Sequence, residues 1–189
     1  MPAQRADARR NRARLLAVAE AEVAAHGADA SLEQIARVAG VGSATVRRHF
    51  PSRHALLEAV FHERVEILSR HARELVDAAD ARAALLEWLR AVTAYAATIR
   101  GLALALCRDQ ATGPDEPHEH CATAQLTEAG DPLVRRAAQQ GAVASGVTIT
   151  DLLTLITGIA LATELHPDPA AEANRLLDLA IAGVSPRQG

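Results

Sequence analysis

The chain has 189 residues, a length that suits one compact unit or a small domain joined to a medium one. Hydrophobic residues make up 49% of it and aromatic residues only 2%, so alanine, leucine and valine must fill the core, as they do between close-packed helices. Two cysteines exclude a disulfide framework. Neither a signal peptide nor an apolar span of about 18 residues is apparent, so we expect a cytoplasmic protein without a membrane partner.

The charge is unevenly distributed along the chain. Residues 1–54 hold nine Arg against five acidic residues, whereas residues 55–189 hold eleven Arg against eighteen acidic residues. A basic N-terminal part on an otherwise acidic protein is typical of a nucleic-acid-binding module attached to a different domain. We therefore expect two domains, residues 1–54 with a basic arm and residues 55–189.

The first predicted helix spans Asn11–His26 and follows a loose, Arg-rich arm at Pro2–Arg10. The apolar residues that share one face of this helix are Leu15, Leu16, Ala19 and Val23. Gly27 ends it. We expect this helix to brace the next two in a three-helix domain.

Residues 31–57 carry the most informative pattern of the chain. Ser31, followed three residues later by Gln34, predicts a capping box at the start of a helix. The helix buries one face, made of Leu32, Ile35, Ala36 and Ala39. Gly40 comes directly after that face, where a left-handed backbone closes a helix most easily.

A second short helix is predicted at Ser43–Phe50. Val46 and Phe50 lie one turn apart and can pack on the preceding helix. The other face carries only hydrogen-bond donors and cations: Ser43, Thr45, Arg47, Arg48 and His49. Two short helices joined by a tight glycine turn, the second with an outward basic face, are typical of a DNA-binding helix-turn-helix.

These residues resemble the N-terminal signature of TetR-type transcriptional regulators. The matching positions are Ala39-Gly40-Val41, Thr45-Val46, His49-Phe50, Pro51-Ser52-Arg53 and Leu56-Leu57. Two positions depart from it, since Gly42 stands where a small polar helix starter is usual and Arg47 where an aromatic residue, usually Tyr, is found. The resemblance implies an all-α, ligand-responsive DNA-binding regulator that acts as a repressor on a palindromic operator.

In a helix-turn-helix, the N-terminal turn of the second helix enters the major groove. The residues expected to reach base edges are Ser43, Thr45 and Arg48, with Arg48 as the bidentate donor to guanine. The residues expected to hold phosphates are Arg47, His49 and Arg53, and Thr45 could do so as well. In the arm, Arg5, Arg9 and Arg10 could follow a phosphate strand or enter the minor groove, and a solvated role is the alternative for each.

The rest of the chain is predicted to be helical, because no alternating strand run bounded by hairpin turns occurs in it. The predicted helices are His54–Ala79, Arg82–Ile99, Leu102–Cys107, Cys121–Gln140 with a kink near Pro132, Asp151–Leu165 and Pro169–Gly183. A polar stretch with two prolines, Asp109–Glu119, is interpreted as a loop. The first of these helices begins in the motif and leaves it, so it is the expected mechanical link between the domains.

The last two predicted helices are apolar over more than one face. Such a helix is buried either in the core of its own chain or against another subunit. The family resemblance implies the second arrangement, a homodimer in which Asp151–Leu165 and Pro169–Gly183 pair with their twofold mates as a four-helix bundle. Ordinary intrachain packing is the alternative.

The resemblance also implies a ligand cavity among residues 80–142. The candidate ligand-binding residues are Trp88, Tyr95, Thr98 and Cys107, although a Trp in an alanine-rich helix is more often part of the core. Because the remaining lining is apolar, we expect a small hydrophobic effector. An alternative keeps the fold without an effector, as in an architectural protein or a co-repressor with a filled bundle.

Residues 115–121 concentrate oxygen, nitrogen and sulfur donors. His118, His120 and Cys121 could begin a zinc or nickel site if this stretch were helical. A solvated loop is the favoured interpretation, since no second cluster supplies further ligands, and we expect neither a metal nor a cofactor. No phosphate loop, nucleophile elbow or Cys-x-x-Cys pair occurs, so an enzyme is not expected; a helical enzyme without a motif is the remaining alternative.

Overall fold

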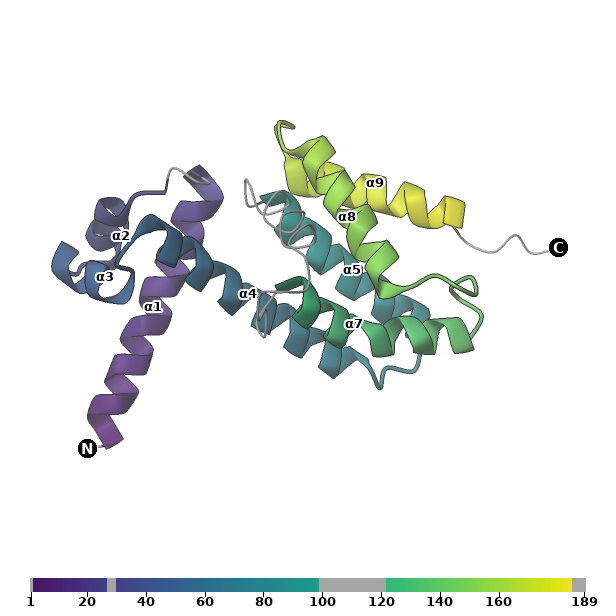
Figure 1. Ribbon diagram of the computed structural model, residues 1–189, viewed down its shortest axis with the longest axis horizontal. Helices are drawn as coiled ribbons and strands as arrows, with labels where there is room; N and C mark the ends of the chain where they lie inside the picture. Colours follow the sequence, from purple (N-terminus) through teal and green to yellow (C-terminus); the bar gives the residue numbers. More distant parts are fainter. Residues whose placement is uncertain (1, 27–29, 99–121, 185–189) are drawn as a thin grey trace, which may run out of the picture. The chain divides into compact units, whose positions relative to one another are not determined.

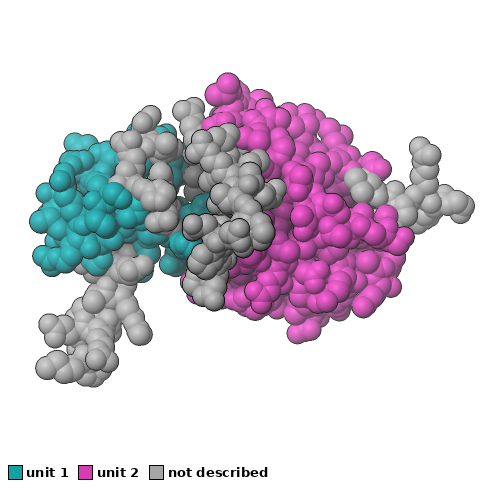
Figure 2. All heavy atoms as spheres, in the orientation of Figure 1, with its two compact units in different colours: residues 1–64 teal, residues 65–189 magenta. Residues whose placement is uncertain are grey.

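The computed structural model describes residues 2–26, 30–98 and 122–184, and all regular structure in these ranges is helical (Figure 1). The described helices are α1 (Pro2–His26), α2 (Leu32–Ala39), α3 (Ser43–His49), α4 (Arg53–Leu75), α5 (Ala81–Thr98), α7 (Ala122–Gln139), α8 (Ile149–Thr163) and α9 (Pro169–Val184). The all-α prediction is confirmed. The chain divides into two compact units, residues 1–64 and 65–189, so the division falls inside α4 and beyond residue 54 (Figure 2).

The first unit is built from α1, α2, α3 and the beginning of α4, and α2 contacts both α1 and α3. Its buried apolar residues come from all four helices and from Phe50: Leu15, Leu16, Ala19, Val23, Ile35, Ala36, Ala39, Val46, Phe50, Leu56 and Val60. The predicted apolar face of α1 thus fills the core, and so does that of α2 except for Leu32, which is half-buried.

The helix α1 begins earlier than predicted. Residues 2–10 were expected to form a loose arm, and that expectation was wrong, because α1 starts at Pro2. Alanine and arginine are among the best helix formers, and they dominate this stretch. Proline is also well suited to the first helical position, where its missing N–H would have no partner in any case.

The helix α2 is fixed at both ends by local signals. The Ser31 hydroxyl accepts a hydrogen bond from the Gln34 amide at 3.2 Å, as the capping-box prediction requires. The reciprocal bond comes from elsewhere, because the Ser31 amide donates to the Glu22 carboxylate of α1 at 3.2 Å. Gly40 ends the helix with φ 64° and ψ 35°, the left-handed conformation that glycine adopts most easily.

The second unit is arranged around α5, which contacts α7, α8 and α9, and α8 also packs on α9 (Figure 1). Helix α8 begins at Ile149 because Thr148 and Asp151 form a complete capping box: the Thr148 hydroxyl accepts from the Asp151 amide and the Asp151 carboxylate accepts from the Thr148 amide. Pro132 lies inside α7. Among the helices of the described ranges, none combines the length and apolar character needed to cross a bilayer.

The turn that joins α4 to α5 is held by α7. The Arg136 guanidinium donates to the Val76 carbonyl, and the side-chain oxygen of Gln140 accepts from the Ala81 amide at 3.2 Å. These bonds satisfy main-chain groups at the end of α4 and the start of α5, which would otherwise lack helical partners.

Candidate nucleic-acid interface

The helix α3 begins on backbone bonds alone. The Gly42 carbonyl accepts from the Thr45 amide at 2.8 Å and from the Val46 amide at 3.3 Å. Gly42 itself is extended, with φ −67° and ψ 144°, and supplies no side-chain cap. The glycine at this departure from the family pattern therefore still allows the short helix to form.

The helix α3 has one buried side and one exposed side. Val46 and Phe50 are almost completely buried, as predicted. The predicted DNA-contacting residues lie elsewhere on its surface: Ser43, Arg47 and Arg48 are exposed, and Thr45 and His49 are half-buried. The helix contains no acidic residue, so its outward side is basic and carries donors suited to phosphates and base edges.

The two neighbouring arginines of α3 are in different situations. Arg47 forms an ion pair with Glu33 of α2, with 2.9 Å between its Nη2 and the Glu33 Oε1. This bond is the main cause that lowers the pKa of the Glu33 carboxyl below its ordinary value. Arg48, by contrast, has no hydrogen-bond or ion-pair partner within the described part of the chain, so its guanidinium is available to an incoming ligand.

Some predicted contacts fall where side chains are not described. Arg53 is the first residue of α4. Its side chain and those of Arg5, Arg9 and Arg10 lie outside the described part of the structure, although their backbone is helical. Their roles stay predictions from the sequence.

In the second unit, Trp88 of α5 is fully buried. Its indole N–H donates to the Leu68 carbonyl of α4 at 2.9 Å. The six-membered ring also lies against Gly130 of α7, where an added Cβ would come within 2.5 Å of the ring atom Cη2. Trp88 therefore fills the space between three helices, with α7 pressed directly against it.

Tyr95 and Thr98, the other candidate ligand-binding residues that the structure describes, are in different environments. Tyr95 is buried on the same helix, and Thr98 is exposed with its hydroxyl donating to the Ala94 carbonyl at 2.7 Å. Cys107 lies outside the described residues, as do His118, His120 and Cys121. Within the described ranges no group of three or more metal-binding side chains is found.

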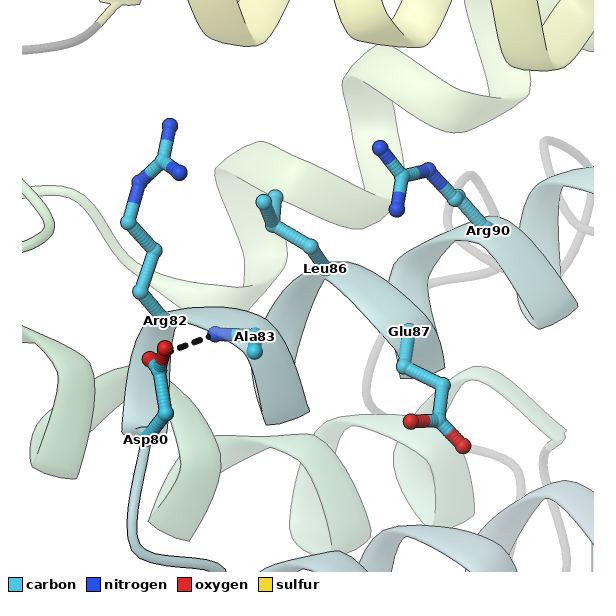
Figure 3. Close-up of a pocket in the computed structure, with 6 residues that line it drawn as sticks. All are labelled: Asp80, Arg82, Ala83, Leu86, Glu87 and Arg90. Carbon is cyan, nitrogen blue, oxygen red and sulfur yellow. Dashed lines mark hydrogen bonds between the residues drawn. The ribbon is translucent and has the colours of Figure 1, made fainter.

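An open hollow of about 560 Å³ lies on the outer surface of α5 (Figure 3). Its lining residues are Asp80, Arg82, Ala83, Leu86, Glu87 and Arg90. Asp80 caps α5 by accepting from the Ala83 amide, and Arg90 is held by Asp178 of α9 at 2.8 Å. The sequence reasoning did not select these residues, because their spacing is that of a solvated helix face. The mixed charge and openness differ from the enclosed apolar cavity that was expected.

Two family models match the chain. Residues 15–60 match the bacterial regulatory proteins of the tetR family. Residues 80–186 match the C-terminal domain of SbtR-like transcriptional regulators. Together they cover the helix-turn-helix and most of the second unit.

Solved structures agree with these matches. A TetR transcriptional regulator from Streptomyces coelicolor is 38% identical, with a TM-score of 0.71 and coverage of 93% of this chain and 99% of that one. A TetR regulatory protein from Mycobacterium vanbaalenii is 33% identical, with a TM-score of 0.66 and coverage of 96% and 99%. At 18% identity and a TM-score of 0.57, FadR from Bacillus subtilis, solved with stearoyl-CoA, shares the fold over 90% of this chain and 98% of its own.

No curated protein matches the chain. The family assignment rests on the two models and on the relatives above 30% identity, which align with nearly the whole chain. Regulators of this family are transcription factors without enzymatic activity. The chain therefore belongs to the TetR family and is a DNA-binding transcriptional regulator.

Proposed function

We propose that the protein is a repressor that binds a palindromic operator as a homodimer and is released by a small apolar effector. The observation that carries the proposal is the exposed side of α3, which carries arginines and no acidic residue and is held by Val46 and Phe50 against a compact helix-turn-helix. A repressor of this kind acts in the bacterial cytoplasm, where the chromosome is.

On the DNA, Arg48 is the proposed reader of sequence. Its guanidinium is exposed and without a partner among the described residues, and it can donate two parallel hydrogen bonds to guanine. Ser43 and Thr45 lie in the first turn of the same helix and are the proposed further contacts to base edges. Arg47, His49 and Arg53 are the proposed phosphate contacts, which position the helix without reading sequence.

The proposed dimer uses α8 and α9. Both helices pack on α5 and still leave a large apolar side chain in the solvent, Leu161 at 37% exposure and Leu179 at 58%. Leu165, just after the end of α8, is 89% exposed. Gly158 and Ala162, exposed on α8 near Leu161, would let a second helix approach closely. A twofold dimer would also present two copies of α3 to successive major grooves, about 34 Å apart.

The proposed effector is apolar because the interior of the second unit offers few polar groups. The buried hydroxyls of Thr93, Thr157 and Thr163 each donate to a carbonyl of their own helix. Ser69 is buried, and its hydroxyl has no hydrogen-bond partner among the described residues, so it could orient one polar group of a ligand. Since most of the other buried side chains of this unit are apolar, an effector inside it would contact mainly apolar atoms.

A regulator without an effector is the second candidate. The observation that favours it is the complete burial of Trp88 against Gly130, since these residues leave no space for a ligand between α5 and α7. A panel of small apolar acids, alcohols and aromatic compounds, added to the protein–operator complex, distinguishes the two. Release of DNA by one of them supports the effector, and none releasing it favours the second candidate.

The primary test is selection of genomic DNA fragments by the purified full chain at about 50 and 200 mM salt. Enrichment of a palindrome with half-sites about one helical turn apart is expected at both concentrations. Sequence-blind binding that disappears at the higher concentration would contradict the proposed operator recognition, because phosphate contacts alone are lost steeply with salt.

The dimer has its own test in light scattering of the full chain and of two variants. Leu161→Glu places a charge on the exposed side of α8 and is expected to give monomers. Val38→Glu is the matched control, because Val38 is an exposed apolar residue of α2 at 57% exposure and should leave the dimer intact. A monomeric wild-type chain at micromolar concentration would contradict the proposed assembly.

A further inference from the structure

One acidic residue lies beside the basic side of α3. Glu33, in the first turn of α2, is the only acidic residue of α2 and α3, and it is paired with Arg47. Both side chains remain well exposed, at 66% for Glu33 and 64% for Arg47. The pair is therefore open to solvent on α2 and α3, the two helices of the helix-turn-helix, where a DNA backbone contacting Arg47 would encounter it.

The Glu33 carboxylate is held in place from three sides. Its Oε1 accepts from Arg47 at 2.9 Å, and its Oε2 accepts from the Ser31 hydroxyl at 3.4 Å. The first turn of a helix also favours a negative charge. Hydrogen bonds from Arg47 and then from its own backbone amide keep the pKa of this carboxyl low. Glu33 is thus ionised and preoriented toward Arg47 at neutral pH.

A DNA phosphate needs the same guanidinium. The Arg47 Nη2 that would donate to a phosphate oxygen already donates to Glu33. Arg47 must either leave the carboxylate or be shared by two anions, and its interaction with Glu33 is weakened in both cases. Arg48 has no such competitor among the described residues.

We propose that Glu33 competes with the DNA phosphate for Arg47 and thereby lowers the affinity for all DNA sequences without altering base readout. The proposal rests on the proposed role of Arg47 at the DNA backbone and adds a residue that sets its strength. In this chain an arginine replaces the usual aromatic residue of the family at position 47, and the acid at position 33 restrains that arginine.

The test compares Glu33→Gln with the wild-type chain in equilibrium binding to the selected operator and to a scrambled duplex. Glutamine keeps the shape and removes the charge. Affinity for both duplexes is expected to rise by the same factor, about two- to fivefold per bound copy of α3, the range for one exposed ion pair. Thermal unfolding of both proteins checks that the variant is folded.

Two further variants separate competition from net charge. Glu20→Gln removes the same charge in the same unit from a residue whose Arg64 partner, at 3.6 Å, belongs to α4. It should change affinity less than Glu33→Gln does. In an Arg47→Ala background, Glu33→Gln should lose most of its effect, because the two residues act on one contact.

The outcomes are distinct. Weaker binding by Glu33→Gln would overturn the proposal and show that the ion pair positions α3 for DNA. Equal gains from Glu33→Gln and Glu20→Gln would overturn it in favour of overall charge. If operator binding is normal but Glu33→Gln changes nothing, this proposal alone fails; if no duplex is bound by any variant, it fails together with the proposed function.

Discussion

The candidate functional side chains of the two units lie in opposite environments, exposed in the first unit and buried in the second. In the first unit, the residues expected to meet DNA stand on the surface of α3, and the core only holds that helix in place. In the second unit, the candidate ligand-binding aromatic residues Trp88 and Tyr95 are buried in the core itself. Exposed residues of α3 can be changed without unfolding the first unit, whereas a change at the buried Trp88 alters the stability of the second unit.

The difference follows from what each unit is proposed to bind. DNA is a large external polyanion, so a few exposed cations on a short helix can contact it. A small apolar effector must be enclosed, so any residues that contact it belong to the same apolar packing that stabilises the unit. From the sequence alone, a hydrophobic side chain such as Trp88 can therefore be assigned either to the core or to a ligand cavity. Its neighbours in the structure are needed to decide between the two.

The largest expected effect is that of Trp88→Ala. Loss of a fully buried Trp leaves a cavity among α4, α5 and α7 and should lower the free energy of unfolding by about 3–5 kcal/mol, measured by urea denaturation followed by circular dichroism. Arg82→Ala on the exposed side of α5 is the control and should change the free energy of unfolding by less than about 0.5 kcal/mol. A small loss at Trp88 together with a changed effector response would instead identify it as a cavity wall.

Gly130→Ala probes the same contact from α7. A Cβ there would lie 2.5 and 2.6 Å from the Trp88 ring and 2.7 Å from the Ile149 Cδ1, so the helices must separate. We expect a net loss of about 1–3 kcal/mol in spite of alanine's better helix propensity. Trp88 is the single tryptophan of the chain, so its fluorescence reports the displacement directly.

The control for this variant is Glu128→Ala, an exposed position of the same helix, which should leave the emission spectrum unchanged. An unshifted spectrum and unchanged stability in Gly130→Ala would mean that α5 and α7 are less tightly packed at this point than the distances indicate. The second unit would then have room to accommodate a ligand beside Trp88.

The sequence predicted well those features that depend on nearby residues. Ser31 and Gly40 bound α2 through contacts within a few positions, and the packing of Val46 and Phe50 follows from one turn of spacing. Long-range partners could not be obtained in this way. The Leu68 carbonyl that receives the Trp88 N–H, and the Glu33 that pairs with Arg47, become neighbours only when separate helices are packed together.

The prediction from nearby residues also failed where the composition of one segment favours two different structures. The residues Pro2–Arg10 are rich in charge, which favours a solvated arm, and rich in helix formers, which favour α1; the second tendency prevailed. Thr148 and Asp151 form a capping box that marks the start of α8 at Ile149. The prediction followed the apolar residues instead and began the helix at Asp151. Elements were thus more predictable than their ends.

In the first unit, Arg48→Ala and Arg47→Ala should have different effects on DNA binding. Loss of Arg48 should relax the preference at one base pair by about 1–3 kcal/mol, measured on operators with single substitutions. Loss of Arg47 should weaken binding to all sequences and flatten the dependence of log K on log salt by about one unit. Uniform loss in both variants would contradict the division between base readout and phosphate contact.

The smallest expected effect is that of Ser31→Ala at the start of α2. The variant removes the acceptor of the Gln34 amide and the donor to Glu33, and helix caps of this kind contribute about 1 kcal/mol. Hydrogen exchange of the Gln34 amide should accelerate, while amides of α8 in the second unit should not change. Ser31→Thr keeps the hydroxyl and should restore protection. Equal acceleration in both units would mean that they unfold as one, and the contrast between an exposed α3 surface in the first unit and a packed core in the second would then lose its energetic basis.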